Sequence, residues 1–102
     1  NEFIIYFINS AGDELPPNSS IGDASPNPSC GRIEIPVRMG DSRELTIAIF
    51  DEAGLPAQPE SKAVFEGEDM IRLDLGAFPS GVYTILVTGK DVRAVRRAVI
   101  AK

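Results

Sequence analysis

The feature that most constrains this chain is a series of short apolar runs whose residues alternate with polar ones and which turn-forming residues separate. In RIEIPVR, for example, Ile33, Ile35 and Val37 would share one face. A period of two is what a half-buried β-strand requires, because successive side chains point to opposite faces. The runs are rich in Ile, Val, Leu, Phe and Thr, which also favours strands. Seven runs are predicted as strands: Phe3–Ile8, Arg32–Arg38, Glu44–Phe50, Lys62–Glu66, Met70–Leu75, Val82–Thr88 and Val92–Ala101.

Turn chemistry supports these boundaries. Turns are predicted at Asp51–Gly54, where glycine can take a positive φ, and at Pro79–Gly81, where proline presets φ. The stretch Val92–Ala101 could also be read as a helical turn, but Gly89–Asp91 before it is typical of a hairpin connection and favours a strand. Pro36 lacks a ladder donor, which indicates a sheet edge or a bulge.

These elements predict an all-β fold, an immunoglobulin-like β-sandwich of about seven antiparallel strands. A chain of 102 residues suffices for one core. Residues 9–29 are rich in Ser, Pro, Asn, Gly and Asp and are predicted as a linker that is long for a compact domain. We therefore expect an N-terminal strand and flexible linker over residues 1–24, and the domain over residues 25–102. The chain begins with Asn rather than Met, so we expect a fragment of a longer protein.

Composition argues against several functional classes. The net charge of −5 is unfavourable for binding nucleic acid, and histidine, the commonest general base, is absent. Cys30 is the single cysteine, so it forms no intramolecular disulfide; we expect a turn-flanking residue rather than a nucleophile. No apolar run approaches the ~20 residues that span a bilayer. The acidic residues cluster at predicted turns, where solvated side chains are expected. No catalytic, cofactor-binding or metal-binding residues are predicted, and the domain is not expected to be an enzyme.

The charge is unevenly distributed along the chain. Residues 90–102 hold five basic side chains and one acidic one, whereas residues 1–89 hold five basic and fourteen acidic ones. A basic stripe on an acidic body can steer a partner electrostatically. The simpler alternative is a solvated outer face that keeps an edge strand from pairing with copies of itself.

Three motifs, taken in order, point to a family. They are SPNPSCGRIEI at residues 25–35, LTIAIFDEAG at residues 45–54, and IRLDLGAFPSGVYTILV at residues 71–87, followed by a final strand that ends at a lysine. Together they resemble the type A C-terminal sorting domains of the type IX secretion system of Bacteroidetes. The resemblance covers residues 25–102. Each motif alone is weak, and their order and spacing carry the match; Pro56 and the proline-rich stretch around it depart from the family pattern.

The resemblance implies an address signal rather than a catalyst. Family members direct a covalently linked upstream cargo from the periplasm through the outer-membrane translocon. An outer-membrane shuttle protein receives the domain, and a sortase usually removes it and anchors the cargo at the cell surface. The product is then held at the outer membrane or cell surface, or secreted. Removal is expected in or upstream of residues 9–24. The alternative is an immunoglobulin-like binding or spacer module of a surface protein.

The final strand is where we expect partners to bind. A last strand with a free end and edge could be recognised by strand addition or by a pocket that captures its end. Tyr83 belongs to this surface or is simply a core aromatic, and Gly81 is also explained as a backbone requirement. A homodimer formed by strand exchange is a further expectation. The predicted recognition residues are Gly81, Tyr83, Val95, Arg96, Arg97, Val99, Ile100 and Lys102.

Overall fold

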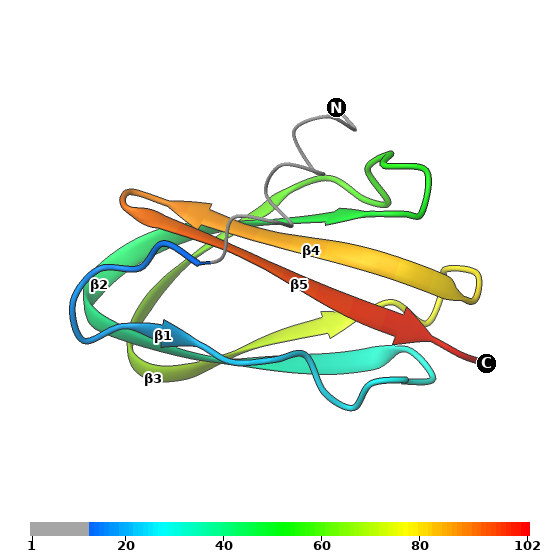
Figure 1. The fold of residues 1–102 in the computed structure, drawn as a ribbon, viewed down its shortest axis with the longest axis horizontal. Coiled ribbons are helices and arrows are strands. Elements are labelled where there is room, and N and C mark those ends of the chain that lie inside the picture. The colour runs from blue at the N-terminus through cyan, green and yellow to red at the C-terminus, as the bar shows by residue number, and fades with distance from the viewer. Residues whose placement is uncertain (1–12) are drawn as a thin grey trace.

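A computed structural model describes residues 13–102, and Figure 1 shows them as β-strands joined by turns and loops. The strands are β1 (Ser20–Ile21), β2 (Arg32–Phe50), β3 (Ser61–Asp74), β4 (Gly81–Gly89) and β5 (Val92–Ile100). Every pairing between them is antiparallel, so the predicted all-β class is confirmed. No helix of the described part is long and apolar enough to cross a membrane.

The predicted count of seven strands is corrected, because two pairs of predicted runs are each one continuous strand. β2 continues through residues 39–43, where its register with β3 shifts, and β3 continues through Gly67. A bulge bends a strand without ending it, and the φ of 65° at Gly67 is a conformation that glycine adopts without strain. The predicted run Phe3–Ile8 lies outside the described residues. β1 is too short for its alternation to be visible in the sequence.

β2 and β3 form one long ribbon that folds over at this bend, so that the sheet curls around its own core (Figure 1). The first half of β2 pairs with β1 and β3, and its second half pairs with β3 and β4, which in turn carries β5. Arg43 stabilises the bend, since it donates to Asp41 (2.8 Å) and to the carbonyl of Lys90 in the β4–β5 turn.

Pro36 lies inside this curled sheet and not at an edge, which corrects one of the two alternatives for that residue. The other alternative, a bulge, agrees with the register beside it, which shifts by one residue between the pairs Ile21–Val37 and Ser25–Glu34. β2 is paired on both sides near Pro36, with β3 through Met70 and with β1 up to Val37. The amide of Gly22 donates to the carbonyl of Pro36 (2.8 Å), but the reciprocal bond is impossible because proline has no N–H. The pairing of β1 with β2 stops at this point, so the proline limits the length of β1.

The core is formed by the inward-facing residues of all five strands. The alternation predicted for β2 is confirmed in both halves, because the apolar residues are buried and most of the residues between them are more exposed. Tight packing of such side chains supplies most of the stability of a small domain. The largest fully buried side chains are those of Ile33, Ile35, Met39, Leu45, Ile49, Leu75, Ile85, Val87 and Ile100.

Two of the three predicted turns are confirmed. Between β3 and β4 the turn lies upstream of the predicted Pro79–Gly81, because the amide of Phe78 donates to the carbonyl of Leu75 (3.0 Å) and Gly81 already belongs to β4. At the end of β2, Oδ1 of Asp51 accepts from the amides of Ala53 and Leu55, and Gly54 has a φ of 82°. Between β4 and β5, a two-residue turn of Lys90 and Asp91 closes the hairpin, with Asp91 at a φ of 60°. The last predicted run is therefore a strand, as the hairpin signal indicated.

The linker predicted over residues 9–29 is corrected for the part that the structure describes. Ile21 and Ala24 are buried in the core, and Ile21 pairs with Val37 of β2. A polar segment needs only one or two well-placed apolar residues to dock on a sheet, which composition alone does not reveal. Residues 13–29, called the covering segment below, therefore pack on the fold. The boundary between residues 24 and 25 stays a prediction.

Truncation of the core should distinguish inward from outward positions. Ile35→Ala is expected to lower the free energy of unfolding by about 2–5 kcal/mol, because the fully buried side chain leaves a cavity. Val64→Ala on the exposed side of β3 is the matched control, expected to change it by less than about 0.5 kcal/mol. Urea unfolding followed by circular dichroism measures both; equal effects would contradict the assigned faces.

Candidate recognition surface around β5

β5 presents two faces of different chemistry, and both contain arginine. Its inward face is buried at every position but one, and that one is Arg96. Arg96 lies opposite the fully buried Ile85 of β4, which confirms that it faces the core side. The inward residues are Val92, Ala94, Arg96, Ala98 and Ile100, and the outward residues are Arg93, Val95, Arg97 and Val99.

Arg96 connects β5 to the covering segment through backbone carbonyls. Its Nε donates to the carbonyl of Gly22 (2.7 Å) and its Nη2 to that of Ile21 (2.6 Å), while Nη1 donates to the carbonyl of Val95 (2.8 Å). Only 14% of its side-chain surface is exposed. The carbonyl of Gly22 receives no hydrogen bond from Pro36, because proline has no N–H. The guanidinium therefore satisfies a polar group that the sheet cannot satisfy.

Two carboxylates balance the charge of Arg96. Its Nη1 and Nη2 donate to the two oxygens of Asp13 (2.9 and 2.6 Å), and Oδ1 of Asp23 lies 3.8 Å from Nε. The hydrogen bond from Arg96 lowers the pKa of Asp13 below its ordinary value, against the opposing effect of partial burial. The same bond raises the pKa of Arg96. A bidentate arginine–carboxylate pair of this kind is strong and directional.

The edge of β5 is not free, which corrects the expectation of an open strand. Near its start, Glu14 and Arg93 exchange two backbone hydrogen bonds of 2.8 Å each. Near its end, the amide of Ser29 donates to Val99 and the carbonyl of Ser29 accepts from Ala101. A partner strand that paired along the whole edge of β5 would first have to displace residues of the covering segment.

Asn27, in the Pro-Asn-Pro turn, covers the edge between these two points. Its side-chain nitrogen donates to the carbonyl of Arg97 (3.1 Å), and its side-chain oxygen accepts from the amide of Val99 (2.8 Å). An asparagine side chain offers one donor and one acceptor group, like the backbone of a pairing strand. The prolines on both sides of Asn27 have no amide to donate, so the side chain takes over that role.

The residues predicted for recognition divide into buried and exposed sets. Tyr83 is buried, its hydroxyl donates to the carbonyl of Pro79 (2.6 Å), and its ring lies 5.9 Å from that of Phe78. This geometry favours the core alternative for Tyr83. Gly81 is half-buried and pairs with the fully buried Ile100 across β4 and β5. Tyr83 and Gly81 therefore contribute little to the outer surface of the β4–β5 hairpin.

The exposed set lies on the outer face of β5 and beyond it. Arg97 and Val99 are exposed, Val95 is half-buried, and the amide of Lys102 donates to Oγ of Ser80 (3.1 Å). The Lys102 ammonium also donates to the carbonyl of Gly76. Within residues 13–102, the side chain of Arg97 forms no ion pair. The basic stripe therefore remains on the surface, but without Arg96.

The role of Arg96 was missed by counting charges, although the sequence contained a signal. Arg96 is two or four residues away from four small or apolar residues, at positions 92, 94, 98 and 100, so in a strand all five share one face. An arginine in the middle of such a series is expected to face inward, and the alanines on either side leave room for a long side chain. The covering partners in residues 13–23 could not be found this way, because no local pattern links them to β5.

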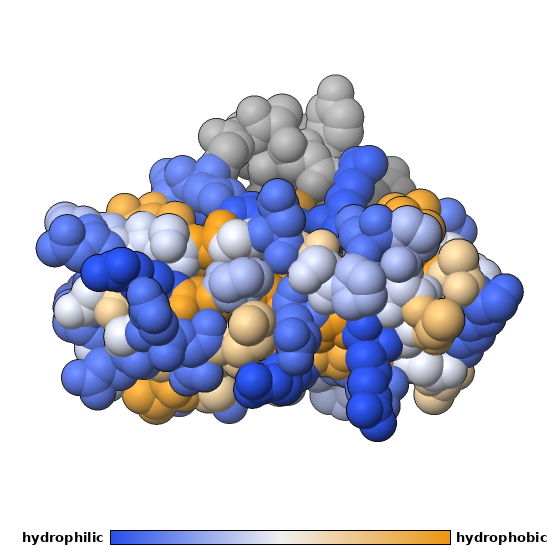
Figure 2. All heavy atoms as spheres, turned by 90° about the horizontal axis from the view of Figure 1, so that it is seen from below, coloured by the Kyte–Doolittle hydropathy of each residue, from blue (hydrophilic) through white to orange (hydrophobic). Residues whose placement is uncertain are grey.

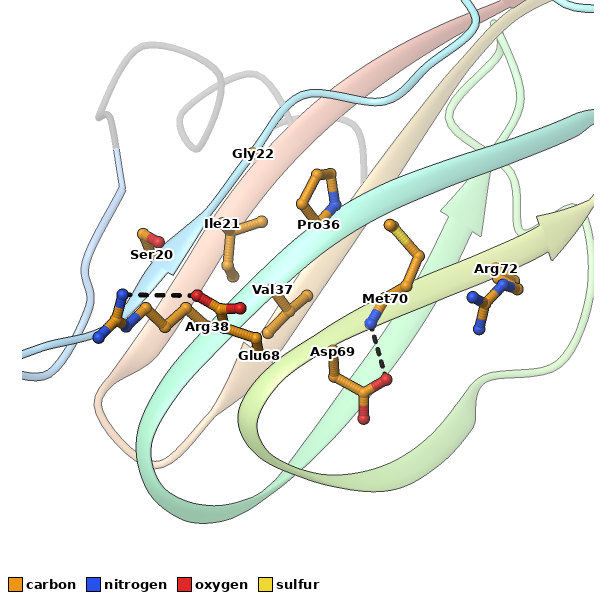
Figure 3. A pocket seen from close by; sticks show the side chains of 10 residues that line it. All are labelled: Ser20, Ile21, Gly22, Pro36, Val37, Arg38, Glu68, Asp69, Met70 and Arg72. Atoms are coloured by element: carbon orange, nitrogen blue, oxygen red, sulfur yellow. Dashed lines mark hydrogen bonds and ion pairs between the residues drawn. The ribbon is translucent and has the colours of Figure 1, made fainter.

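A shallow groove of about 710 Å³ lies over β1, β2 and β3 (Figure 3). Pro36 and Met70 lie at its centre, and the two arginines beside them are paired, Arg38 with Glu68 (3.7 Å) and Arg72 with Glu34 (3.2 Å). Viewed from below, Figure 2 shows hydrophilic and hydrophobic residues intermixed. Within residues 13–102, no three acidic or cysteine side chains gather to hold a metal ion. The groove is open and its charges are compensated.

Removing the Arg96 guanidinium should destabilise the domain far more than removing its neighbour. Arg96→Ala is expected to lower the free energy of unfolding by about 1–3 kcal/mol, because carbonyls of the covering segment and Asp13 lose their donor. Arg97→Ala, one residue away on the outer face, should change it by less than about 0.5 kcal/mol. Denaturant titration of both variants decides, and similar losses would refute the inward position of Arg96.

The ion pair should also make stability depend on pH. The folded-state pKa of Asp13 lies below its unfolded value of about 3.9, so the pair stabilises the fold above that value and is lost as the pH falls through the folded pKa. The difference in unfolding free energy between the wild type and Asp13→Asn is expected to be constant from pH 5 to 7 and to shrink below about pH 4. A difference that is undiminished at pH 2 would exclude this contribution.

Comparison with known proteins finds one family whose sequence model matches this chain. The sequence model of a family described as the secretion system C-terminal sorting domain matches residues 24–101. No curated protein and no solved structure matches the chain. The matched range begins within the covering segment, at the buried Ala24, and contains β2 to β5 entirely.

Proposed function

This chain belongs to the family of secretion system C-terminal sorting domains, and we propose that it directs an upstream cargo through the type IX outer-membrane translocon without performing chemistry of its own. The observation that carries the proposal is the family match over residues 24–101, which contains every long strand of the fold. The domain would be received by an outer-membrane shuttle protein after transit of the periplasm. A sortase would then remove it and leave the cargo at the cell surface.

We assign recognition to the outer face of β5 and to Lys102. Three observations support this choice: Arg97 and Val99 are exposed, Lys102 is fixed to the loop around Gly76, and the region carries the basic surplus of the chain. Basic residues around an apolar side chain can bring an acidic partner surface into register and then bury area against it. Gly81, Tyr83, Arg96 and Ile100 would act indirectly, by holding β4 and β5 in this position.

We also propose that the fold is a member of the immunoglobulin-like sandwich class with few strands. The ribbon of β2 and β3 folds over, so one half lies above the other, as the two sheets of a sandwich do (Figure 1). The hydroxyl of Tyr83 bonds back to a carbonyl four residues upstream, which is similar to the tyrosine corner of such domains.

The covering segment influences where a sortase could cut. A protease needs extended and unpaired backbone, whereas residues 13–24 contain β1 and the bridge from Glu14 to Arg93. We therefore propose cleavage upstream of Asp13. A homodimer in which two copies exchange this segment is the corresponding proposal for self-association, because its contacts with β2 and β5 can equally be made to a second copy.

A reporter fusion tests the sorting function directly. Residues 1–102 fused to a periplasmic reporter, in a host that has this secretion machinery, should bring the reporter to the cell exterior. The combined variant Arg97→Glu, Val99→Ser and Lys102→Glu should leave the reporter in the periplasm, because it reverses the charge of the proposed surface and changes no core residue. Cell fractionation and immunoblotting measure the distribution.

The matched control changes charges on strands that do not pair with β5. Arg38→Glu, Val64→Ser and Lys62→Glu alter the same residue types at exposed positions of β2 and β3, and this variant should still be exported. Both variants must show the circular dichroism spectrum of the folded domain. Full export of the β5 variant would remove β5 as the recognition surface, and failure of the unaltered fusion would remove the sorting function.

A further inference from the structure

The contacts that cover the edge of β5 differ in burial, and the covering residues of the first one are exposed to solvent. Asp13 and Glu14, called the acidic pair below, hold this edge through one bridge to Arg93 and one ion pair to Arg96. Both residues are exposed. At the other end of the edge, the buried Ser29 pairs with β5 through its backbone.

The chain sequence limits how firmly the acidic pair can bind. Leu15 follows it and is only partly buried, and then come Pro16 and Pro17, which have no amides and end any strand pairing. The bridge is therefore isolated and cannot extend into a longer strand. Segments with few buried contacts and exposed hydrogen bonds open at low cost, well below the cost of global unfolding.

The β5 side of this contact stays organised when the acidic pair leaves. Arg96 remains fixed by the carbonyls of Ile21 and Gly22, and Asp23 stays close enough to balance its charge. Arg93 exposes its backbone donor and acceptor beside it. An extended segment meets there a pairing edge, a pre-oriented guanidinium and the basic side chains of Arg93 and Arg97.

We propose that the backbone of Arg93 and the guanidinium of Arg96, at the edge of β5, form a binding site for an extended acidic segment of a partner protein, which the acidic pair occupies in the free domain. The partner segment needs a carboxylate that reaches Arg96, followed by a residue that exchanges backbone hydrogen bonds with Arg93. Charge complementarity favours such a segment, because the strand is basic and the present occupant is Asp-Glu. The assignment of this partner to the secretion machinery rests on the proposed function.

The covering segment is a competitor in this scheme. An intramolecular occupant acts at a high effective concentration, so the site is open in only a fraction of the molecules. The apparent affinity for a partner segment is the intrinsic affinity multiplied by that fraction. Weakening the acidic pair should therefore strengthen binding in trans. This prediction has the opposite sign from that of a merely structural contact, whose loss would only destabilise the domain.

A peptide titration tests the site without any secretion assay. The probe is acetyl-DELPPNSS-amide, which copies residues 13–20, and the control probe is acetyl-NQLPPNSS-amide, which lacks both carboxylates. Each is added to the ¹⁵N-labelled full chain and to its variant Asp13→Asn/Glu14→Pro. The Arg93 amide and the Arg96 Nε–H resonances report on the site.

The acidic probe is expected to bind the variant with an apparent Kd at least about tenfold lower than the wild type, and the control probe should bind neither. Equal affinity for both chains, equal binding of both probes, or no binding at all would overturn the proposal. If the variant dimerises without peptide, as sedimentation would show, the occupant is a second copy, and the proposal of a separate partner is wrong.

A disulfide lock tests whether the acidic pair must leave for export. Glu14→Cys and Arg93→Cys, in a Cys30→Ser background, would tie the pair to β5, because hydrogen-bonded antiparallel partners have Cα atoms about 5.5 Å apart. The oxidised reporter fusion should lose export at least about tenfold. The matched control, Ser20→Cys/Arg38→Cys in the same background, locks β1 to β2 and should still be exported.

These outcomes separate the inference from the sorting function. If the Cys30→Ser fusion without a lock is not exported, the sorting function itself fails. If that fusion and both locked fusions are exported equally, sorting stands and displacement of the acidic pair is refuted. Loss of export in both locked fusions also counts against the proposal, because the effect would then not be specific to the edge of β5.

Discussion

The docking of the covering segment on β5 depends on one arginine that faces inward. Arg96 lies on the core side of β5, where its neighbours of the same parity are small or apolar. It can lie there because it reaches the carbonyls of Ile21 and Gly22 at one end of the curled sheet and the carboxylate of Asp13 at its margin. A nearly buried guanidinium is tolerated only when its donors are satisfied and its charge is balanced. The covering segment supplies both carboxylates and all but one of the hydrogen-bond acceptors of Arg96, the other being the carbonyl of Val95, so strand and segment depend on each other.

The same contact solves a problem that Pro36 creates. A proline in the paired part of β2 ends the ladder with β1 and leaves the carbonyl of Gly22 without its usual partner. Arg96 supplies that donor from a residue 74 positions away in sequence. The side chains of Arg96 and Asn27 thus join β5 to the covering segment. Continuous strand pairing in their place would have required a longer β1.

Two of the outer strands of the sheet, β3 and β5, are protected in different ways. β3 pairs with β2 only, among the described strands, and its exposed side carries charged residues, while the Asp69 carboxylate accepts from the amide of Met70. Charged side chains and self-satisfied amides discourage pairing with other chains. The edge of β5 is covered by the chain itself. A partner chain that offers the same hydrogen bonds can replace the covering segment at this edge.

The sequence by itself determined the strand class, the inward residues of β2, the turns at Asp51–Gly54 and at Gly89–Asp91, and the family, because alternation and turn chemistry are local properties. It misjudged the number of strands, since a bulge near Gly40 and a glycine at position 67 bend a strand without ending it. The docking of residues 13–29 on β5 was decided by the tertiary structure alone. Those contacts join residues some 70 positions apart or more, and only the curl of the sheet brings Asp13, Asn27 and Arg96 together.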